Sequence, residues 1–407
     1  MSGRDMARRP EGLVGLQPED GWNDKPGQRW RGRAFAPAPL GTVMLRRQTD
    51  SDISSSAGGT DVTGDKTQVG AKSVLPPVEQ VKPGIWSVPV PIPDNPLHYV
   101  VIYILESDAG LVMIDAGWDA PESFSALERG IRAAGGKLED VVAVLVTHIH
   151  PDHYGLAGRI RELSGAWIGL HPADATMIHD RYEDPAPLLE KQEAWLRGAG
   201  SPDDEVEAMR DSSLEVLRYV RVAPPDVLIE GADRPRVPGW DLIALHTPGH
   251  TPGHLCFYEE RSETLFTGDH VLPRITPNVG FHAQSSANPL GDFLSSLDLL
   301  RRFGDIVAYP AHEWPFEGLQ HRIDALIAHH TERLDRIEAA IGNGARTVWE
   351  VASQLSWSRG WDRLQGFMRR AALSETWAHI ILLEEQGRVV RSTPIGVVPV
   401  RWEPAPH

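Results

Sequence analysis

Cysteine, long apolar runs and basic charge are all scarce in this 407-residue chain. The single cysteine, Cys256, excludes a disulfide framework and a cysteine-based zinc site, and it fits a reducing compartment. No apolar run reaches the roughly 18 residues that a membrane span needs, and the N-terminus lacks the apolar segment of a secretory signal. We therefore expect a cytoplasmic protein with no membrane partner.

The shortage of basic residues gives the chain a formal net charge of −16. Residues 1–75 hold 11 Lys/Arg against 9 Asp/Glu, so the remaining 29 Lys/Arg and 47 Asp/Glu give the rest a net charge of −18. A body of this charge repels phosphate backbones and lacks the basic footprint that nucleic-acid binding usually needs. A nucleic-acid partner is therefore disfavoured, although a local basic patch stays compatible with these numbers.

Composition divides the chain into three predicted parts, namely 1–78, 79–320 and 321–407. The first is predicted to be a disordered extension, because its Ser/Gly/Asp/Thr-rich stretch at 50–68 has almost no apolar residues to bury. The second carries the strand patterns and most of the motifs. The third is predicted to be a small winged-helix-like domain of three helices and a ribbon, at 319–342, 347–355, 360–387 and 388–393.

Strand patterns recur from residue 85 onwards. Apolar, β-branched runs predict strands at 85–92, 99–105, 111–117, 141–147, 166–171, 240–247, 254–260, 264–270 and 305–312. Helical patterns lie between them, at 121–135, 155–165 and 186–221. Strands first, then alternating strands and helices, then strands again indicate an α+β fold with two packed sheets and helices outside.

Three histidines and an aspartate crowd into THIHPDH, directly after the buried strand at 141–147. They are His148, His150, Asp152 and His153, and we expect them on the loop that leaves the carboxyl end of this strand. Imidazole and carboxylate groups are ligands for Zn²⁺ and similar divalent ions, and ligand sites in α/β sheets lie at strand ends. A metal site is the first interpretation of this motif, and an accidental cluster is the second.

Three further motifs place a histidine or an aspartate at a strand end. LHTPGHTPGH holds His246, His250 and His254 in a Pro/Gly-rich stretch that cannot be helical. FTGDH holds Asp269, and YPAHEW holds His312. Each motif alone has a structural interpretation, as a water-facing hairpin, a turn or a packed histidine. The ordered set of four strand ends favours a shared metal site.

This ordered set, THIHPDH, HTPGHTPGH, TGDH and PAHE with LVMIDAG upstream, resembles the metallo-β-lactamase-fold superfamily over about residues 80–320. The resemblance implies an αββα sandwich with a two-metal site at one edge. It implies a supporting role for Asp115 of LVMIDAG, and outer roles for His246 and His254. The ligand set it implies is one ion on His148, His150 and His250, a second on Asp152, His153 and His312, and Asp269 as the bridge.

The activity that the resemblance implies is hydrolysis with two divalent metal ions. We expect zinc, with iron or manganese compatible with the same ligands. Two such ions hold a bridging hydroxide and polarise the substrate, and Asp152 is placed to orient that hydroxide or to carry its proton. The chain has Asp269 where penicillin-hydrolysing relatives commonly have cysteine, and His150 where redox di-iron relatives have Glu. It is therefore most similar to the glyoxalase-II-like branch, which cleaves thioesters and esters.

Three functions stay open from the sequence. The first is a metal-dependent hydrolase of a thioester, ester or lactone in a small or carrier-linked acyl substrate. The second is a metal-dependent ribonuclease or phosphodiesterase of the same fold, which the charge of −18 disfavours. The third is a regulator whose C-terminal domain binds DNA, which the complete ligand set disfavours.

The segments around the motifs have expected roles as well. The helical segment 186–221 is expected either to roof the site or to form a plain surface helix pair. RITPNVGFH, residues 274–282, is expected to line the substrate cleft, with His270 and His282 as outer contacts. The C-terminal domain is expected to be an interaction or packing module, and a homodimer is one assembly it allows.

Overall fold

The computed structural model describes residues 75–211, 215–394 and 396–406. The predicted disordered extension comprises residues 1–78, and residues 1–74 of it lie outside the described residues. Within the described ranges, no helix combines the length and the apolar character needed to cross a membrane.

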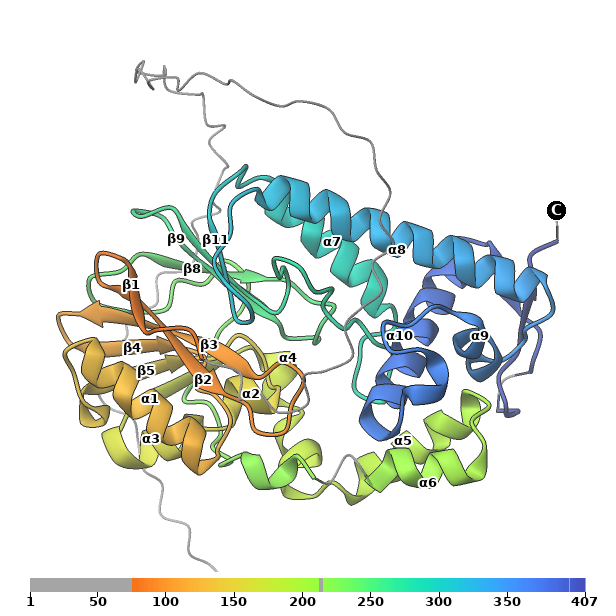
Figure 1. The fold of residues 1–407 in the computed structure, drawn as a ribbon, viewed down its shortest axis with the longest axis horizontal. Helices are drawn as coiled ribbons and strands as arrows, with labels where there is room; N and C mark the ends of the chain where they lie inside the picture. Colours follow the sequence, from red (N-terminus) through yellow and green to blue (C-terminus); the bar gives the residue numbers. More distant parts are fainter. Residues whose placement is uncertain (1–74, 212–214, 395, 407) are drawn as a thin grey trace, which may run out of the picture. The chain divides into compact units, whose positions relative to one another are not determined.

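Two β-sheets form the centre of the fold (Figure 1). The larger sheet has, in spatial order, β1 (Glu79–Lys82), β2 (Ile85–Pro91), β3 (Tyr99–Ser107), β4 (Gly110–Ile114), β5 (Val141–Leu145), β6 (Trp167–Leu170) and β7 (Val227–Leu228). The smaller sheet has β11 (Ala308–Pro310), β10 (Thr264–Gly268), β9 (Leu255–Glu259) and β8 (Leu242–His246). Strands β4 to β7 run parallel, as do β10 and β11, so the carboxyl ends of β4, β5 and β6 share one edge.

Helices cover the outer faces of both sheets, which confirms the predicted αββα arrangement (Figure 1). Helices α1 (Pro121–Ala133) and α3 (Ala157–Ser164) pack on the seven-stranded sheet. Helices α7 (Pro289–Arg301) and α8 (Leu319–Gly342) pack on the four-stranded sheet. Helix α7 was not predicted from the sequence. Its start carries a recognisable signal, because the Asn288 side chain accepts a hydrogen bond from Gly291 N at 2.9 Å and Pro289 is the first helical residue.

Three hydrophobic clusters fill the spaces between these layers, and strand β3 shows how the sequence builds them. Tyr103 and Leu105 belong to the cluster between the two sheets, whereas Ile102 and Ile104 belong to the cluster under α1 and α3. This period of two places both faces of the strand in apolar surroundings. Each fully buried side chain of this size contributes about 1.5–3 kcal/mol of transfer free energy. Cys256 of β9 is buried in the third, outer cluster.

The C-terminal part consists of helices and a ribbon, as predicted. Beyond α8 it contains α9 (Val348–Gln354), α10 (Gly366–Glu385) and the antiparallel pair β12 (Val389–Arg391) and β13 (Trp402–Pro404). The outer hydrophobic cluster continues across residue 320, since Phe293, Leu326 and Trp377 all belong to it. The winged-helix-like character and the domain boundaries stay predictions.

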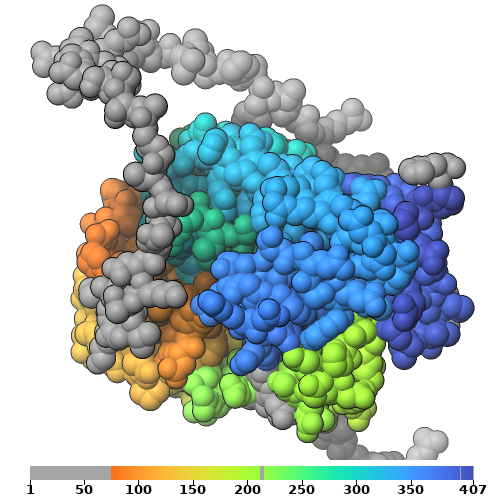
Figure 2. Space-filling view, turned by 45° about the vertical axis from the view of Figure 1, so that its right-hand side comes forward, coloured from red at the N-terminus to blue at the C-terminus, as the bar shows by residue number. Residues whose placement is uncertain are grey.

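The helical insert packs against the C-terminal helices and is not a plain surface pair. Its helices are α5 (Ala186–Gly198) and α6 (Asp203–Asp211). Leu196 and Met209 are fully buried in the same cluster as α10. The rings of Trp195 and Trp377 stack with centroids 5.4 Å apart. In the space-filling view, the yellow-green surface of the insert adjoins the blue surface of the C-terminal helices (Figure 2).

Candidate metal centre

The THIHPDH motif leaves the carboxyl end of β5 and turns at once into the one-turn helix α2 (Pro151–Tyr154). His148 and His153 are fully buried, and Asp152 is 8% exposed. From the sequence the whole motif was expected on a loop. In the structure His150 is the N-cap of α2, and Asp152 and His153 lie within the helix, with Pro151 at its first position. The short helix therefore points successive side chains into one place.

The HTPGHTPGH motif forms the turn between β8 and β9, and only one of its three histidines joins the cluster. His250 Nε2 lies 3.0 Å from His150 Nδ1. His246 stacks on His171 with ring centroids 4.1 Å apart. His254 Nε2 accepts a hydrogen bond from Asp269 N at 3.1 Å. His246 and His254 thus support the turn and the neighbouring strand end.

The glycines of this turn permit close approach of buried groups. A side chain on Gly249, whose φ is +135°, would lie 2.5 Å from Phe293 of α7. A side chain on Gly253 would lie 2.6 Å from Asp174 Oδ1. Glycine is therefore required at both positions for the turn that holds His250.

Asp174, which was not identified from the sequence, ties the two histidine-bearing segments together. It lies on the short helix α4 (Pro172–Ala175) and is fully buried. Its Oδ2 accepts hydrogen bonds from Ile149 N at 2.9 Å and from Thr251 Oγ1 at 2.8 Å, and its Oδ1 accepts one from Gly253 N at 2.7 Å. One carboxylate thus fixes the positions of both segments relative to each other.

Asp269 and His312 follow the parallel strands β10 and β11 and meet the other residues from the smaller sheet. Asp269 Oδ1 lies 3.4 Å from His312 Nε2 and 3.5 Å from His153 Nε2. Its second oxygen, Oδ2, lies 3.5 Å from His250 Nε2. The two oxygens of one carboxylate therefore face different histidines.

All seven predicted site residues converge in one cluster. His148, His150 and His250 form one group whose ligand atoms lie within 4.8 Å of one another, and Asp152, His153 and His312 form another. His148, His153 and Asp269 also meet that limit, so the aspartate lies between the two groups. Four strand ends that are far apart in sequence thus deliver one set of nitrogen and oxygen donors.

The donor atoms of this cluster fit a bound cation. His153 Nε2, His312 Nε2 and Asp269 Oδ1 are buried and have no hydrogen-bond partner among the described residues. Buried polar atoms are almost always partnered, and a set of imidazole nitrogens and carboxylate oxygens is a ligand set for divalent transition metals. Cations bound by the two donor groups would coordinate these three unpartnered atoms.

The outer nitrogens of the histidine rings are held by hydrogen bonds. His153 Nδ1 donates to Asp115 Oδ2 at 2.8 Å, and His250 Nδ1 donates to the carbonyl of Asn278 at 2.8 Å. His312 Nδ1 donates to the carbonyl of Tyr99 at 3.0 Å. These bonds fix the Nδ1 proton of each ring and aim Nε2 into the cluster, which is how metal-binding histidines are usually oriented.

Asp115 supports the first motif from behind, as the resemblance implied. Besides His153, its carboxylate accepts hydrogen bonds from Thr147 N at 2.7 Å and from Thr147 Oγ1 at 2.9 Å. Its φ is +65°, a left-handed conformation that Asp tolerates better than most residues. Asp115 therefore orients the ligand segment and belongs to neither of the two donor groups.

The charges in the cluster differ between its two sides. Burial, followed by the neighbouring histidines, holds the pKa of His148 well below its usual range, so its ring is neutral. Burial also lowers the pKa of His312, but the Asp269 carboxylate outweighs this effect and raises the pKa to about 10. A cation bound beside Asp269 competes with that proton, so metal binding should release protons.

The two remaining histidines from the sequence analysis lie near the cluster without joining it. His270 is fully buried and packs against Phe293 with centroids 4.7 Å apart. His282 ends the 274–282 segment, and its Nδ1 accepts a hydrogen bond from Gln284 N at 3.2 Å. The segment reaches the cluster through Asn278, whose carbonyl binds His250.

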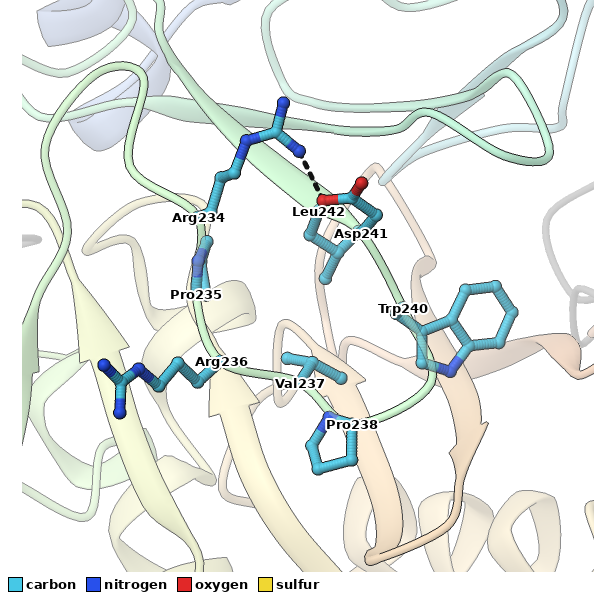
Figure 3. Close-up of a pocket in the computed structure, with 8 residues that line it drawn as sticks. All are labelled: Arg234, Pro235, Arg236, Val237, Pro238, Trp240, Asp241 and Leu242. Carbon is cyan, nitrogen blue, oxygen red and sulfur yellow. Dashed lines mark hydrogen bonds and ion pairs between the residues drawn. The ribbon is translucent and has the colours of Figure 1, made fainter.

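A separate surface hollow is lined by residues 234–238 and 240–242, none of which belongs to the cluster (Figure 3). Its most prominent charge, Arg234, is paired with Asp241 and with Glu260 Oε2, the latter at 2.8 Å. Trp240 Nε1 donates to the carbonyl of Glu106 at 2.6 Å. The polar groups of this hollow are thus engaged in holding the loop.

Comparison with known proteins points to one family. The sequence pattern of the Metallo-beta-lactamase superfamily matches residues 95–312. The crystal structure of a metallo-beta-lactamase family protein from Thermus thermophilus, TTHA1429, is similar, with a TM-score of 0.69 and 33% sequence identity. The similarity covers 80% of this chain and 100% of that chain.

Two similar proteins are named as thioesterases. The atrochrysone carboxyl ACP thioesterase of Aspergillus fumigatus is 34% identical over 260 residues, which are 62% of this chain and 48% of that protein. The atrochrysone carboxyl ACP thioesterase dmxR1 of a Cryptosporiopsis species is 23% identical over 350 residues, which are 81% of this chain and 89% of that protein.

Proposed function

Since the chain belongs to the metallo-beta-lactamase superfamily of hydrolases, we propose that it uses two divalent metal ions to cleave a thioester, ester or lactone bond. The substrate is a small or carrier-linked acyl compound. Thioesters are the preferred class, because two similar proteins carry the name of acyl-carrier-protein thioesterases. The net charge of −16 supports the preference for acyl compounds over nucleic acids.

In this proposal the seven clustered residues are the metal ligands. One ion is held by His148, His150 and His250, the other by Asp152, His153 and His312, with Asp269 between them. The proposal is supported most directly by the orientation of the Asp269 carboxylate. Its Oδ1 faces His312 and His153, whereas its Oδ2 faces His250. A carboxylate whose two oxygens face different donor groups is well placed to bridge two metal ions.

When bound, the ions supply a water nucleophile that is ionised near neutral pH and a Lewis acid for the scissile carbonyl. Zinc is the proposed metal, and iron or manganese accept the same donors. Asp152 Oδ2 faces His312 Nε2 at 3.3 Å. Burial raises the pKa of Asp152, but His153 and His312 outweigh it and keep the carboxyl ionised. Asp152 is thus able to accept a proton and pass it to the leaving thiolate or alkoxide.

The test pairs metal content with initial rates. Metal per chain is measured by mass spectrometry, and rates are measured on acyl thioesters with lactones and on single-stranded RNA. We expect about two metal ions per chain and turnover of an acyl substrate. Asp152→Ala should lower kcat by about 10²–10⁴-fold. His321→Ala, an exposed histidine of α8, is the matched control and should leave both readings unchanged.

Two outcomes would contradict the proposal. RNA cleavage that disappears in Asp152→Ala, without any acyl turnover, would identify a nuclease instead. Absence of both metal and turnover would remove the metal centre as the working site and direct attention to the C-terminal helices.

A further inference from the structure

Arg181 lies beside the metal cluster on a π-helical turn, η2 (His179–Glu183), that precedes the helical insert. Its neighbour Tyr182 donates a hydrogen bond to the carbonyl of Ile149 at 2.6 Å, and Ile149 stands between His148 and His150. The turn is therefore anchored to the ligand segment itself. Arg181 plays no part in the ligand set, and the proposed hydrolysis does not use it.

A second segment is joined to Arg181 by a hydrogen bond. Arg181 Nε donates to Gln284 Oε1 at 3.1 Å, and Gln284 belongs to the stretch that follows β10. That stretch also supplies the Asn278 carbonyl that binds His250 at 2.8 Å. Arg181 is thus linked to the segment that carries His150, through its neighbour Tyr182, and to the stretch that binds His250, through Gln284.

Helix α10 holds this stretch in place. Phe281 N donates to the carbonyl of Ser374 at 3.0 Å, and a side chain on Gly280 would lie 2.0 Å from Ser374 Oγ. The contact is therefore tight and leaves little freedom. Arg370 lies one helical turn before Ser374 and brings a second cation to the same side of α10.

The positive charge of Arg181 is not neutralised by its sequence neighbours. Asp180 pairs with Lys191 at 4.0 Å, and Glu183 pairs with His179 at 2.9 Å. Among the described residues, no carboxylate forms an ion pair with Arg181. The guanidinium has five hydrogen-bond donors, and Gln284 uses only one of them.

The electrostatic effects show which groups face this charge. Burial, followed by the charge of Arg181, lowers the pKa of Arg370 to about 10. Burial, Arg181 and Arg370 together lower the pKa of His282 to about 3. His150 of the cluster also faces Arg181. The charge of Arg181 also acts on the buried Asp174 carboxylate, with which it forms no ion pair among the described residues. Arg181 and Arg370 thus bring two cations close to the metal cluster in a protein whose net charge is −16.

We propose that Arg181 binds an oxyanion of the substrate, a carboxylate or a phosphate, and makes the enzyme selective for acyl substrates that carry one. This inference rests on the proposed hydrolase function and names its substrate class. A guanidinium forms paired, charge-assisted hydrogen bonds with either oxyanion. Such bonds correspond to roughly a ten- to hundredfold effect on binding. The carboxylate would lie on the acyl group, whereas a phosphate would lie on the thiol arm of a carrier.

The experiment compares matched charged and neutral thioesters on the metal-loaded protein. The first pair is the succinyl thioester of N-acetylcysteamine and its methyl ester, which differ only in the acyl carboxylate. The second pair is the butyryl thioester of 4′-phosphopantetheine and that of pantetheine, which differ only in the phosphate. The variants are Arg181→Gln, Arg181→Lys as the conservative change, and Arg129→Gln as a control on the exposed face of α1.

We expect the wild type to prefer one charged member of a pair by roughly ten- to hundredfold in kcat/KM. Arg181→Gln should remove that preference and leave the neutral substrate within about twofold of the wild type. Arg181→Lys should restore part of the preference, because it keeps the charge but loses the planar fork. Preference in the first pair identifies the acyl carboxylate, and preference in the second identifies the phosphate. Arg129→Gln should match the wild type.

Calorimetric binding of the corresponding non-hydrolysable thioethers separates this inference from the proposed hydrolysis. Charged thioethers that bind in an Arg181-dependent manner, without turnover of any thioester, would support the oxyanion site and contradict thioester hydrolysis. Equal losses for charged and neutral compounds in Arg181→Gln would assign Arg181 a merely structural role and overturn the inference. Equal binding of charged and neutral thioethers by the wild type would overturn it as well.

Discussion

Replacing Asp174 tests how the fold holds the cluster together. In Asp174→Ala, the donors Ile149 N, Thr251 Oγ1 and Gly253 N lose an acceptor that they contact at 2.7–2.9 Å. Each unpaired buried donor costs about 1–3 kcal/mol, so with three donors the free energy of unfolding should fall by about 3–9 kcal/mol. That is a large part of the 5–15 kcal/mol typical of a folded domain. The segments that carry His150 and His250 should then separate, and the bound metal should fall with them.

Asp174→Asn should have an intermediate effect. Its amide nitrogen must face a backbone N–H, either that of Ile149 or that of Gly253, so at least one donor stays unpaired. We expect a loss of about 1–3 kcal/mol. Urea unfolding of the metal-free protein measures both variants, with Asp298→Ala as the control because that side chain is 80% exposed. An Asp174→Ala protein within about 0.5 kcal/mol of the wild type would refute the reasoning.

Three further changes test separate parts of the structure. Asp115→Asn keeps the shape and tolerates the φ of +65°, but removes the charge behind His153. Its affinity for zinc, measured by chelator competition, should fall roughly 10- to 100-fold, and an unchanged affinity would contradict the supporting role. Gly249→Ala would place a side chain 2.5 Å from Phe293. It should lower the free energy of unfolding by roughly 2–4 kcal/mol, and a fully stable variant would contradict the tight turn. Leu196→Ala, at a fully buried position of α5, should cost about 2–5 kcal/mol in urea unfolding; a loss below about 1 kcal/mol would show that α5 does not pack as described.

The parts of the fold that the sequence predicted are those set by local patterns. Alternation in β3 and the apolar run of β5 indicated strands because the period of two is a property of neighbouring residues. The site residues were also predictable, since each one lies at or shortly after the end of such a strand. The structure brings all seven of them together. Their roles as metal ligands remain predictions until metal is measured.

The features that the sequence did not reveal depend on contacts between distant residues. Asp174 binds residues 25 and 79 positions away, and nothing in its own neighbourhood distinguishes it from an ordinary helix-start aspartate. Arg181 gains its significance from Gln284, 103 positions away. Helix α7 is different, because its Asn288 cap and Pro289 are a local signal that the sequence does contain. Asp152 and His153 were assigned to a loop because a one-turn helix has too short a pattern to recognise.

The most direct test of the metal centre is an anomalous difference map from a crystal of the zinc-loaded protein, recorded on both sides of the zinc absorption edge. We expect two peaks about 3.5–4 Å apart, one within bonding distance of His148, His150 and His250, the other of Asp152, His153 and His312. Asp269 should contact both. A single peak, no peak at this cluster, or peaks bound by other residues would contradict the two-metal assignment.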